Sequence, residues 1–581
     1  MNKILICGLL LAFAGFSYSA AVSQEVIDKK RKDRDTTTRI ILKTGKFVED
    51  VREANDTIRA ATAVEKERGY ILFSSDYSEQ IFHNSVPTEK SGLKCASFGS
   101  PGEYIPLTFS VYPLKDLKAA KVFSSGLSSG KDSIGPENFE VRTVWHMPKR
   151  TGPHIFRMNP WLMEKKDTMD ILAGEKTLWG AVKAGPTRQW WITVKIPEDA
   201  KPGLYKGTIE FSPANSAAAS VPVEVEVLPI KLVSPKNFNM WFFDDPNIRN
   251  DNFVNSFREH GVYGTTIGLR GLQVSAQGID FKGFEEDADL ALNKGLNGSF
   301  LIYAQPLSHA IADALKTKLH SPVFVSEGRK MIEHFNRQVK DKYGEKVEIF
   351  YFGIDEPGNS EERRRELTPL IKWLKTIEGV TVVETLNGPD VYKLYGQYTD
   401  VNWSYALWPE LDKAFLLGNG KRLSLNVWID SGSILHARLE PGLFPWKNNY
   451  SSLKMWSFNS SSGDPLNDLD GGDPDWCLTG PCENDPEDIM PSVNYEAMRK
   501  GVDDRRYVVT LEQLIEKSKA YPNLAGKAGA AKKLLESFGA LIPDTRTKLA
   551  ALKPDVITFE KLEAFKREVA NKIMELEAAE K

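Results

Sequence analysis

Short apolar runs separated by longer amphipathic stretches dominate the chain after residue 236. We count eight such runs, and the stretches between them are typical of helices, most clearly at Val325–Tyr343 and Ser360–Glu378. Continuous apolar strands covered by helices predict a parallel sheet, and eight such units in about 220 residues predict a (β/α)8 TIM-type barrel. The runs are Asn237–Phe243, Gly264–Arg270, Gly298–Tyr303, Ile349–Ile354, Val380–Leu386, Val401–Leu407, Leu423–Asp430 and Leu453–Asn459.

The pattern before residue 236 is different. Alternating segments separated by Pro, Gly and Ser turns predict a β-sandwich there. A stretch with two prolines, Leu228–Pro235, is typical of a linker at its end. The predicted strands are Gly69–Ser74, Tyr104–Tyr112, Glu140–His146, Gln189–Lys195, Gly207–Phe211 and Val221–Leu228.

The two ends of the chain differ from both of these parts. Residues 1–20 have the charged start, apolar core and small residues of a secretory signal, which predicts an exported protein, periplasmic or secreted. Residues 521–581 read as helices with an apolar stripe from Phe559 to Ile573, expected to pack on the barrel, with a partner-binding coiled coil as the alternative. The predicted domains are therefore the signal at 1–20, the sandwich at 21–235, the barrel at 236–520 and the helices at 521–581.

Composition narrows the possible partners. The net charge of −3 and the lack of a basic cluster give no reason to expect nucleic acid. No segment after the signal is apolar for long enough to insert into a membrane. The 13 Trp and 18 Tyr offer apolar faces of the kind that stack on sugar rings, so we expect a glycan substrate. The sequence does not specify the oligomeric state.

Two adjacent acids, Asp355 and Glu356, follow the fourth apolar run of the barrel. Pro357 is expected to hold Glu356 in an extended conformation. If one carboxylate stays ionised, it raises the pKa of the other, so the pair can supply both a base and a protonated acid near neutral pH. The alternative is a turn whose acid caps the next helix, but Asn359 or Ser360 already offers that cap.

Other polar and aromatic residues lie at the ends of the predicted strands. Catalytic groups of (β/α)8 barrels collect at this edge, so we interpret these residues as candidate substrate contacts, although any single Trp is more often core packing. They are Trp241, Arg270, Tyr303, Asn387, Tyr405, Trp428, Asp430, Trp456 and Asn459.

An acidic loop precedes two closely spaced cysteines. The loop lacks the Glu that would complete an EF-hand, so we predict no metal and interpret it as a wall of the site, with Asp475 and Trp476 contacting sugar. Cys477 and Cys482 are expected to form a small disulfide that holds this wall, because an exported protein meets oxidising conditions.

Three motifs carry a resemblance to a known family. The runs Gly353–Pro357, Gly471–Trp476 and Tyr495–Asp504 resemble glycoside hydrolase family 123, over the barrel and the preceding sandwich. The resemblance implies an exo-acting β-N-acetylgalactosaminidase that retains configuration by substrate-assisted catalysis and needs no cofactor. It implies Glu356 as the general acid/base and Asp355 as the residue that orients the 2-acetamido group. We assign the hydroxyl that steadies the acetamido oxygen to Tyr405.

Two alternatives remain open at this point. A conventional retaining glycosidase needs carboxyl groups about 5–5.5 Å apart on opposite sides of the anomeric carbon, which neighbouring residues do not easily supply. Asp430 at the end of the seventh run could act as the nucleophile with Glu356 as the acid. The other alternative is a glycan-binding protein built on an inactive barrel. The intact acid pair argues against this alternative.

Overall fold

The computed structural model describes most of the chain after residue 56, and the account below concerns the described residues. The predicted signal at 1–20 lies outside them. The described residues are 46–47, 57–79, 81–82, 85–118, 120–152, 155–163, 168–169, 176–177, 180–181, 187–235, 238–243, 248–266, 272–404, 422–427, 433–460, 476–482, 485–553 and 555–580.

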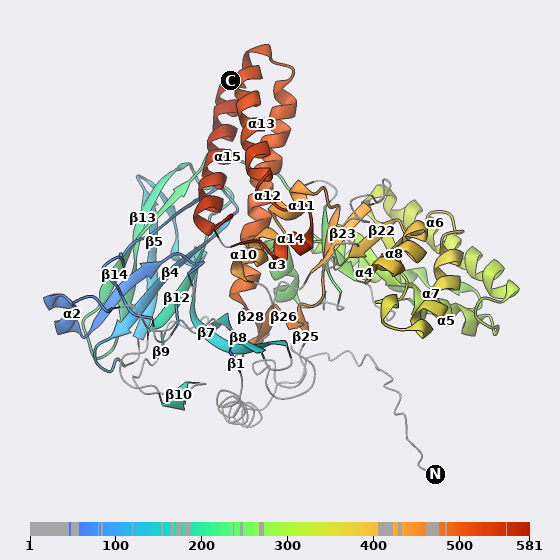
Figure 1. The fold of residues 1–581 in the computed structure, drawn as a ribbon, viewed down its shortest axis with the longest axis horizontal. Helices are drawn as coiled ribbons and strands as arrows, with labels where there is room; N and C mark the ends of the chain where they lie inside the picture. Colours follow the sequence, from blue (N-terminus) through green and yellow to red (C-terminus); the bar gives the residue numbers. More distant parts are fainter. Residues whose placement is uncertain are drawn as a thin grey trace, which may run out of the picture.

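Two six-stranded sheets occupy the first part of the chain (Figure 1). The first has the order β1-β8-β7-β12-β4-β2, and the second has β3-β14-β13-β5-β6 with β9 paired to β5. All six predicted strands are present, and β1, β3, β5, β6, β8 and β9 add to them. Their bounds are β1 Lys46–Phe47, β2 Tyr70–Ser75, β3 Cys95–Gly99, β4 Tyr104–Pro113, β5 Ala120–Ser129, β6 Asp132–Ile134, β7 Phe139–Gly152, β8 Ile155–Met163, β9 Thr168–Met169, β12 Arg188–Lys195, β13 Gly203–Ser212 and β14 Ala219–Val227.

A shared hydrophobic core joins these two sheets. Its geometry is clearest around Phe211 of β13, whose ring meets three rings of the first sheet. The centroid distances are 5.1 Å to Tyr70, 5.3 Å to Trp190 and 6.5 Å to Phe109. Such edge-on contacts between aromatic rings are favourable beyond the area they bury, so they help to fix the two sheets against each other.

Eight parallel strands form one sheet in the second part, and each matches one predicted run. Their order is β15-β24-β23-β22-β21-β20-β19-β16. The Gly264 amide beside β16 donates a 3.1 Å hydrogen bond to the Met240 carbonyl of β15, so the first and last strands of this order are in contact. The bounds are β15 Asn239–Phe242, β16 Thr265–Thr266, β19 Ser299–Tyr303, β20 Glu348–Phe352, β21 Thr381–Thr385, β22 Val401–Ser404, β23 Arg422–Val427 and β24 Ser452–Met455.

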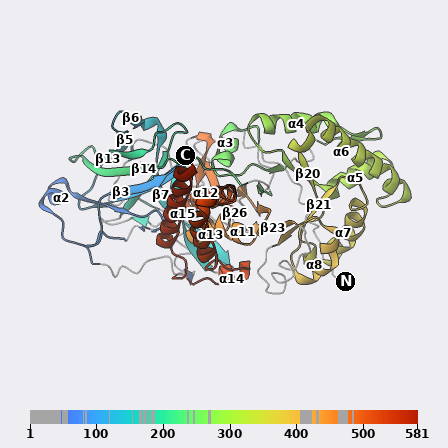
Figure 2. The same cartoon turned by 90° about the horizontal axis from the view of Figure 1, so that it is seen from above.

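Helices follow most of these strands, which confirms the mixed α/β class. Figure 2 shows α4 to α8 lying along the outer side of β20 and β21. The two predicted helices are confirmed as α6 and α7, α6 being preceded by a π-helical turn at Phe324–Gly328. The bounds are α3 Asp251–Glu259, α4 Phe281–Asn293, α5 Ala304–Ala314, α6 Arg329–Tyr343, α7 Glu361–Leu374, α8 Pro389–Tyr395, α10 Ile434–Leu439 and α11 Leu443–Lys447.

Side chains of the parallel strands alternate between two cores. In β20, Phe350 and Phe352 join an aromatic cluster with Trp241 and Trp403, whereas Tyr351 between them packs in the cluster formed with the helices. Successive residues of a strand point to opposite faces, so the sheet has a dense aromatic face opposite the face covered by helices. The predicted acid pair follows β20 directly.

The C-terminal helices form a projecting bundle. Figure 1 shows α12 (Val493–Ser518), α13 (Ala525–Gly539) and α15 (Phe559–Glu580) side by side, with the short α14 (Arg546–Ala550) near their base. The predicted apolar stripe of α15 is buried. It packs against other elements and not only against the eight-stranded sheet. Phe565 stacks on Phe538 of α13 with centroids 3.8 Å apart, and Arg567 lies over Phe98 of β3.

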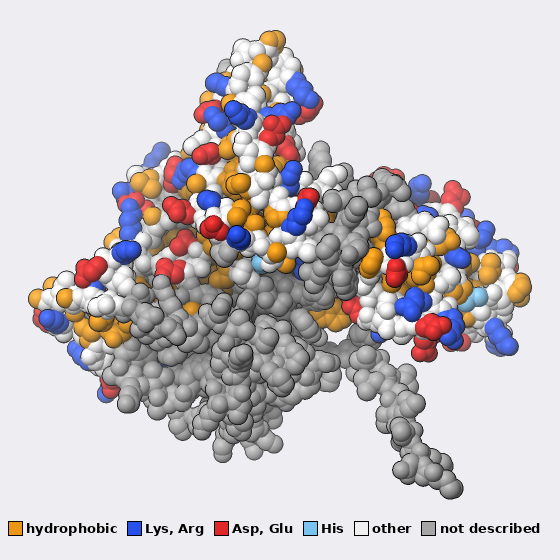
Figure 3. All heavy atoms as spheres, viewed as in Figure 1, with side chains coloured by type: hydrophobic (Ala, Val, Ile, Leu, Met, Phe, Trp, Pro, Cys, Tyr) orange, Lys and Arg blue, Asp and Glu red, His pale blue; other side chains and the backbone are white. Residues whose placement is uncertain are grey.

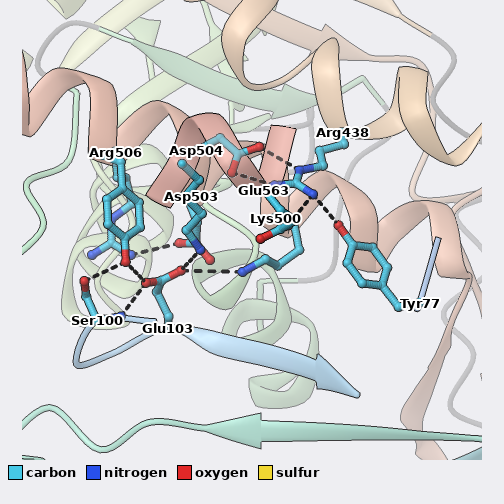
Figure 4. Close-up of polar contacts among 11 residues, drawn as sticks. Tyr77, Ser100, Glu103, Arg438, Lys500, Asp503, Asp504, Arg506 and Glu563 are labelled. Atoms are coloured by element: carbon cyan, nitrogen blue, oxygen red, sulfur yellow. Dashed lines mark hydrogen bonds and ion pairs between the residues drawn. The ribbon is translucent and has the colours of Figure 1, made fainter. Parts of the chain in front are cut away.

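A buried carboxylate, Glu103, ties α15 to the first two sheets (Figure 4). It is fully buried between β3 and β4. Its Oε1 accepts a 2.7 Å hydrogen bond from Lys566 of α15, and its Oε2 accepts a 2.6 Å bond from the Tyr507 hydroxyl of α12. Lys500 of α12 lies 3.5 Å from the same Oε1. Because an unpaired buried charge is costly, these partners fix the helices at this position.

A second buried charge, Arg438 of α10, makes a similar junction beside the first. Its Nε and Nη2 donate to both Asp504 oxygens of α12, at 2.7 and 2.9 Å. Its Nη1 donates to Glu563 of α15 at 2.6 Å and to the Tyr77 hydroxyl at 2.7 Å. Thus one guanidinium joins α10, α12, α15 and the segment after β2.

Charges of both signs are interspersed on the visible surface. Figure 3 shows Lys and Arg side chains alternating with Asp and Glu over the helical bundle and over the helices of the second part. Among the described residues of this face, neither sign of charge gathers into a patch of its own.

Candidate functional site

Asp355 lies in the short segment that follows β20, at the carboxyl end of the strand. Strands β19, β20 and β21 are parallel, so their carboxyl ends meet at this edge. Within the described part of the chain, Asp355 Oδ1 is buried without a hydrogen-bond partner. Burial raises the pKa of Asp355, Lys454 lowers it and Glu356 raises it, with a net rise. An unsatisfied buried acceptor of this kind calls for an explanation, and a ligand is one.

Glu356 has a backbone conformation that the sequence analysis did not foresee. Its φ of 49° and ψ of 59° lie in the left-handed region, so the prediction of an extended residue before Pro357 is wrong. The ring of a following proline disfavours the right-handed helix, and the η5 turn Pro357–Asn359 selects the left-handed alternative. A side chain larger than Gly holds this conformation at a cost of about 1–3 kcal/mol, and such strain is concentrated at functional sites.

A chain of hydrogen bonds holds the Glu356 side chain. The Asn359 amide nitrogen donates to Glu356 Oε2. Asn387, after β21, donates to Asn359 Oδ1 at 2.8 Å, and its own Oδ1 accepts the Gly358 amide at 2.7 Å. Asn387, predicted to contact sugar, therefore positions the turn that carries Glu356.

Glu384 of β21 is fully buried and lies close enough to Asp355 for their charges to interact. Its two oxygens accept the Ile354 amide at 3.2 Å and the Thr385 amide at 3.1 Å. Burial raises its pKa well above the usual value. A Cβ at Gly353 would lie 2.2 Å from Glu384 Oε2, so only glycine fits against this carboxyl.

Lys454 of β24 reaches the same place from another strand. It is fully buried, and its Nζ lies 3.9 Å from Asp355 Oδ1, near enough for an ion pair but too far for a hydrogen bond. The Nζ lies 3.5 Å from the centre of the Phe243 ring and 4.8 Å from that of Trp403, in cation–π contact. Burial lowers the pKa of Lys454 to about 8, although Asp355 acts to raise it.

Sequence reasoning missed both Glu384 and Lys454. The available signal was a single ionisable residue inside an otherwise apolar strand, in Val382–Leu386 and in Ser452–Trp456. Lys and Glu are rarely fully buried unless they are paired, and such residues mark functional sites more often than chance.

The predicted aromatic contacts divide into two groups. Tyr303 and Trp456 are partly buried beside Phe243: the Tyr303 hydroxyl donates to the Phe243 carbonyl at 2.7 Å, and Trp456 stacks on its ring at 5.3 Å. Trp241 is 1% exposed and packs against Phe350. The structure thus places the Trp241 ring in core packing, the alternative that the sequence analysis left open for any single Trp.

Asn459 is exposed on β25 (Asn459–Ser460), which pairs with β26 (Trp476–Cys477). Cys477 is buried, with its Sγ 3.0 Å from the Ser460 carbonyl oxygen. The side chains of Trp476 and Cys482 lie outside those described, so the disulfide and its role stay predictions. The remaining candidates, Arg270, Tyr405, Trp428, Asp430 and Asp475, lie outside the described residues.

None of the described helices has the length and apolar character that crossing a bilayer requires. No cluster of His, Cys, Asp or Glu among the described side chains could hold a metal ion.

Comparisons with known proteins agree with this arrangement. Residues 83–212 match the glycoside hydrolase 123 N-terminal domain. A family 123 glycoside hydrolase from Clostridium perfringens, whose structure addresses glycolipid glycan hydrolysis, aligns with a TM-score of 0.64 at 13% identity, over 88% of this chain and 100% of that chain. The chain resembles glycoside hydrolase family 123. The resemblance expected from the motifs is thereby confirmed, and the two matches together support a glycoside hydrolase.

A second solved structure is less similar. A family 39 glycoside hydrolase from Bacteroides cellulosilyticus WH2 aligns with a TM-score of 0.34 at 12% identity, over 65% of this chain and 80% of that chain, too low to carry an argument. No curated protein matches the sequence.

Proposed function

We propose that this protein releases terminal β-linked N-acetylgalactosamine from glycans, including those of glycolipids, by retaining, substrate-assisted catalysis. The observation that carries the proposal is the Asp355 carboxylate beside Glu356, whose buried Oδ1 has no hydrogen-bond partner among the described residues. A substrate amide N–H would satisfy that oxygen. The resemblance to family 123 and to an enzyme studied on glycolipid glycans supports the substrate class.

The reaction needs no protein nucleophile. The acetamido oxygen of the substrate attacks the anomeric carbon while the bond to the leaving oxygen breaks, which forms a bicyclic oxazolinium. Asp355 accepts the acetamido N–H and balances the positive charge that develops on the nitrogen. Glu356 donates its proton to the leaving oxygen and then removes a proton from the water that opens the ring, restoring both groups.

Placement of the carboxyl groups favours this mechanism over a conventional one. A covalent retaining mechanism needs a carboxylate about 5–5.5 Å from the acid, across the sugar. Asp355 and Glu356 follow the same strand, and Glu384 is fully buried with both oxygens bonded to backbone amides. Asp430 remains the residue on which the conventional alternative depends.

The proposed architecture follows from the same observations. We propose that the eight parallel strands close as a (β/α)8 barrel, supported by the Gly264–Met240 hydrogen bond, and that the two preceding sheets form a sandwich, supported by their shared core. The division at residues 235 and 520 and export through residues 1–20 belong to this proposal.

Substrate choice tests the proposal directly. An aryl N-acetyl-β-galactosaminide should be hydrolysed and the matching aryl β-galactoside should not, because only the first carries the nucleophile. A thiazoline mimic of the oxazolinium should inhibit the enzyme. Equal turnover of both glycosides would refute the mechanism and favour Asp430, and thiazoline binding without any turnover would indicate a glycan-binding protein.

The roles of the two acids are separable by leaving group. Glu356→Gln should slow substrates with poor leaving groups far more than activated aryl glycosides, because a departing oxygen of high basicity needs the proton most. Asp355→Asn should slow both kinds, since it disturbs the attacking group. Rates that depend on the leaving group equally in the two variants would contradict this division of roles.

A further inference from the structure

Three ionisable side chains from three parts of the barrel sheet meet below the site. Asp355 follows β20, Glu384 belongs to β21 and Lys454 belongs to β24. Two carboxyl groups thus lie within the electrostatic influence of one ammonium group, in a region enclosed by aromatic rings. Burying a second unpaired charge there would cost several kcal/mol, so the protonation states of the three groups depend on one another.

Of the two carboxyl groups, Glu384 is the one without a paired cation among the described residues. Among the described residues it makes no ion pair within 4.0 Å, and it is fully buried. The Ile354 and Thr385 amides stabilise either form of the group, but two neutral donors do not replace water around a full charge. The neutral acid is therefore the form that this position favours.

The ammonium group of Lys454 is paired with the carboxyl group of Asp355. Its Nζ lies against the faces of Phe243 and Trp403, and the carboxylate oxygen paired with it is Asp355 Oδ1, at 3.9 Å. Aromatic faces stabilise an ammonium without neutralising it. Its positive field therefore remains available to Asp355.

We propose that Lys454 is a positioning residue that keeps Asp355 ionised, and that Glu384 stays protonated beneath it so that the ammonium serves Asp355 alone. The assignment of Asp355 as the group that acts on an acetamido N–H rests on the proposed function, but the charge states do not. The charged groups that act on Asp355 from the neighbouring elements are Lys454 of β24, Glu356 of the same turn, Glu384 of β21 and Arg363 of α7.

The first test removes the ammonium. Lys454→Met keeps a long unbranched side chain without charge, so Asp355 should take up a proton more readily. The acid limb of the pH profile of kcat/KM should move up by at least one pH unit, with a loss of tenfold or more at pH 5 and a smaller loss at pH 8. Lys372→Met, a change of an exposed lysine on α7, is the matched control and should leave the profile in place.

The second test uses Glu384→Gln, which preserves shape and removes the proton of the neutral acid. If Glu384 is already neutral, the acid limb should stay within a few tenths of a pH unit. If Glu384 were ionised, its removal would favour ionised Asp355 and move the limb down by a full unit. A downward shift, or an unmoved limb in Lys454→Met, would overturn the proposal.

An infrared measurement decides the charge states without activity. At pH 7 the wild type should show the carbonyl stretch of a protonated buried carboxyl, and Glu384→Gln should lack it. Lys454→Met should show a second such band near pH 6, absent from Lys454→Met combined with Asp355→Asn. If no N-acetylhexosaminide is cleaved but these bands appear, the proposed function fails and the inference stands; without them the inference fails whatever the activity.

Discussion

Replacing Arg438 by Met should weaken the junction between the first two sheets and the C-terminal helices. The guanidinium is fully buried and donates to Asp504, Glu563 and the Tyr77 hydroxyl. Methionine fills much of the same volume, but it leaves these acceptors without their donor. Asp504 loses most, because its side chain is 4% exposed, whereas that of Glu563 is 31% exposed and can turn to water.

The expected size follows from the burial of the Arg438–Asp504 pair. Removing one partner of a buried ion pair costs about 3–5 kcal/mol, since the remaining charge stays buried. The matched control is Arg365→Met on α7, whose pair with Glu361 is 3.6 Å long and whose side chains are 76% and 80% exposed. Exposed pairs contribute less than about 1 kcal/mol, so the same substitution there should have little effect.

Urea unfolding followed by tryptophan fluorescence would measure the difference in stability. A chain with several parts need not unfold in one step, so limited proteolysis of α15 should be followed as a second readout. Arg438→Met should unfold at lower urea and release α15 faster than the Arg365→Met control. Equal midpoints and equal cleavage rates for the two variants would show that Arg438 does not hold the junction.

Two further outcomes follow from the buried polar groups. Burial raises the pKa of the Glu496 carboxyl, but the neighbouring Arg499 and His260 lower it, to about 2. Because the pKa is depressed in the folded state, the stabilisation that Glu496 contributes is complete above the usual value of 4.5 and should be lost between pH 4.5 and 2. An acid titration of stability would measure this loss, and Glu496→Gln should flatten it. Asn387→Ala should lower kcat/KM by up to about 10²-fold, since Glu356 loses its support, while the free energy of unfolding changes by less than about 1 kcal/mol. A folded variant with full activity would contradict the positioning role.

The eight strands of the second part were predictable because a parallel sheet covered by helices needs apolar side chains on both faces. Continuous apolar runs such as Ile349–Ile354 meet this requirement, and they can be recognised from a few adjacent residues. In the first part, a strand such as β14 was visible because Val221 to Val227 alternates with outward polar residues. Strands β3 and β5 lack this signal: their small and polar residues are drawn into the sheets by pairing with β14 and β13.

The acid pair was predictable and its conformation was not. Asp355 and Glu356 are neighbours in the chain, so a strand followed by Pro357 was enough to single them out. The left-handed turn at Glu356 is hydrogen-bonded to Asn387, which belongs to the next strand-helix unit. The preference of a residue before proline for extended backbone reflects local steric energies alone. Here contacts from another strand outweigh those energies.

The groups that set the charge at the site are dispersed for a physical reason. Neighbouring residues of a strand point to opposite faces, so one strand cannot place an acid, a neutral carboxyl and an ammonium around the same point. Parallel strands can, because residues at one level of the sheet come from segments that are dozens of residues apart. Asp355, Glu384 and Lys454 come together in this way, and the loss of the Lys454 ammonium is expected to alter the protonation of Asp355. The charge state of this site is therefore a property of the parallel arrangement of strands, and the linear motif that identifies Asp355 and Glu356 does not contain the other two groups.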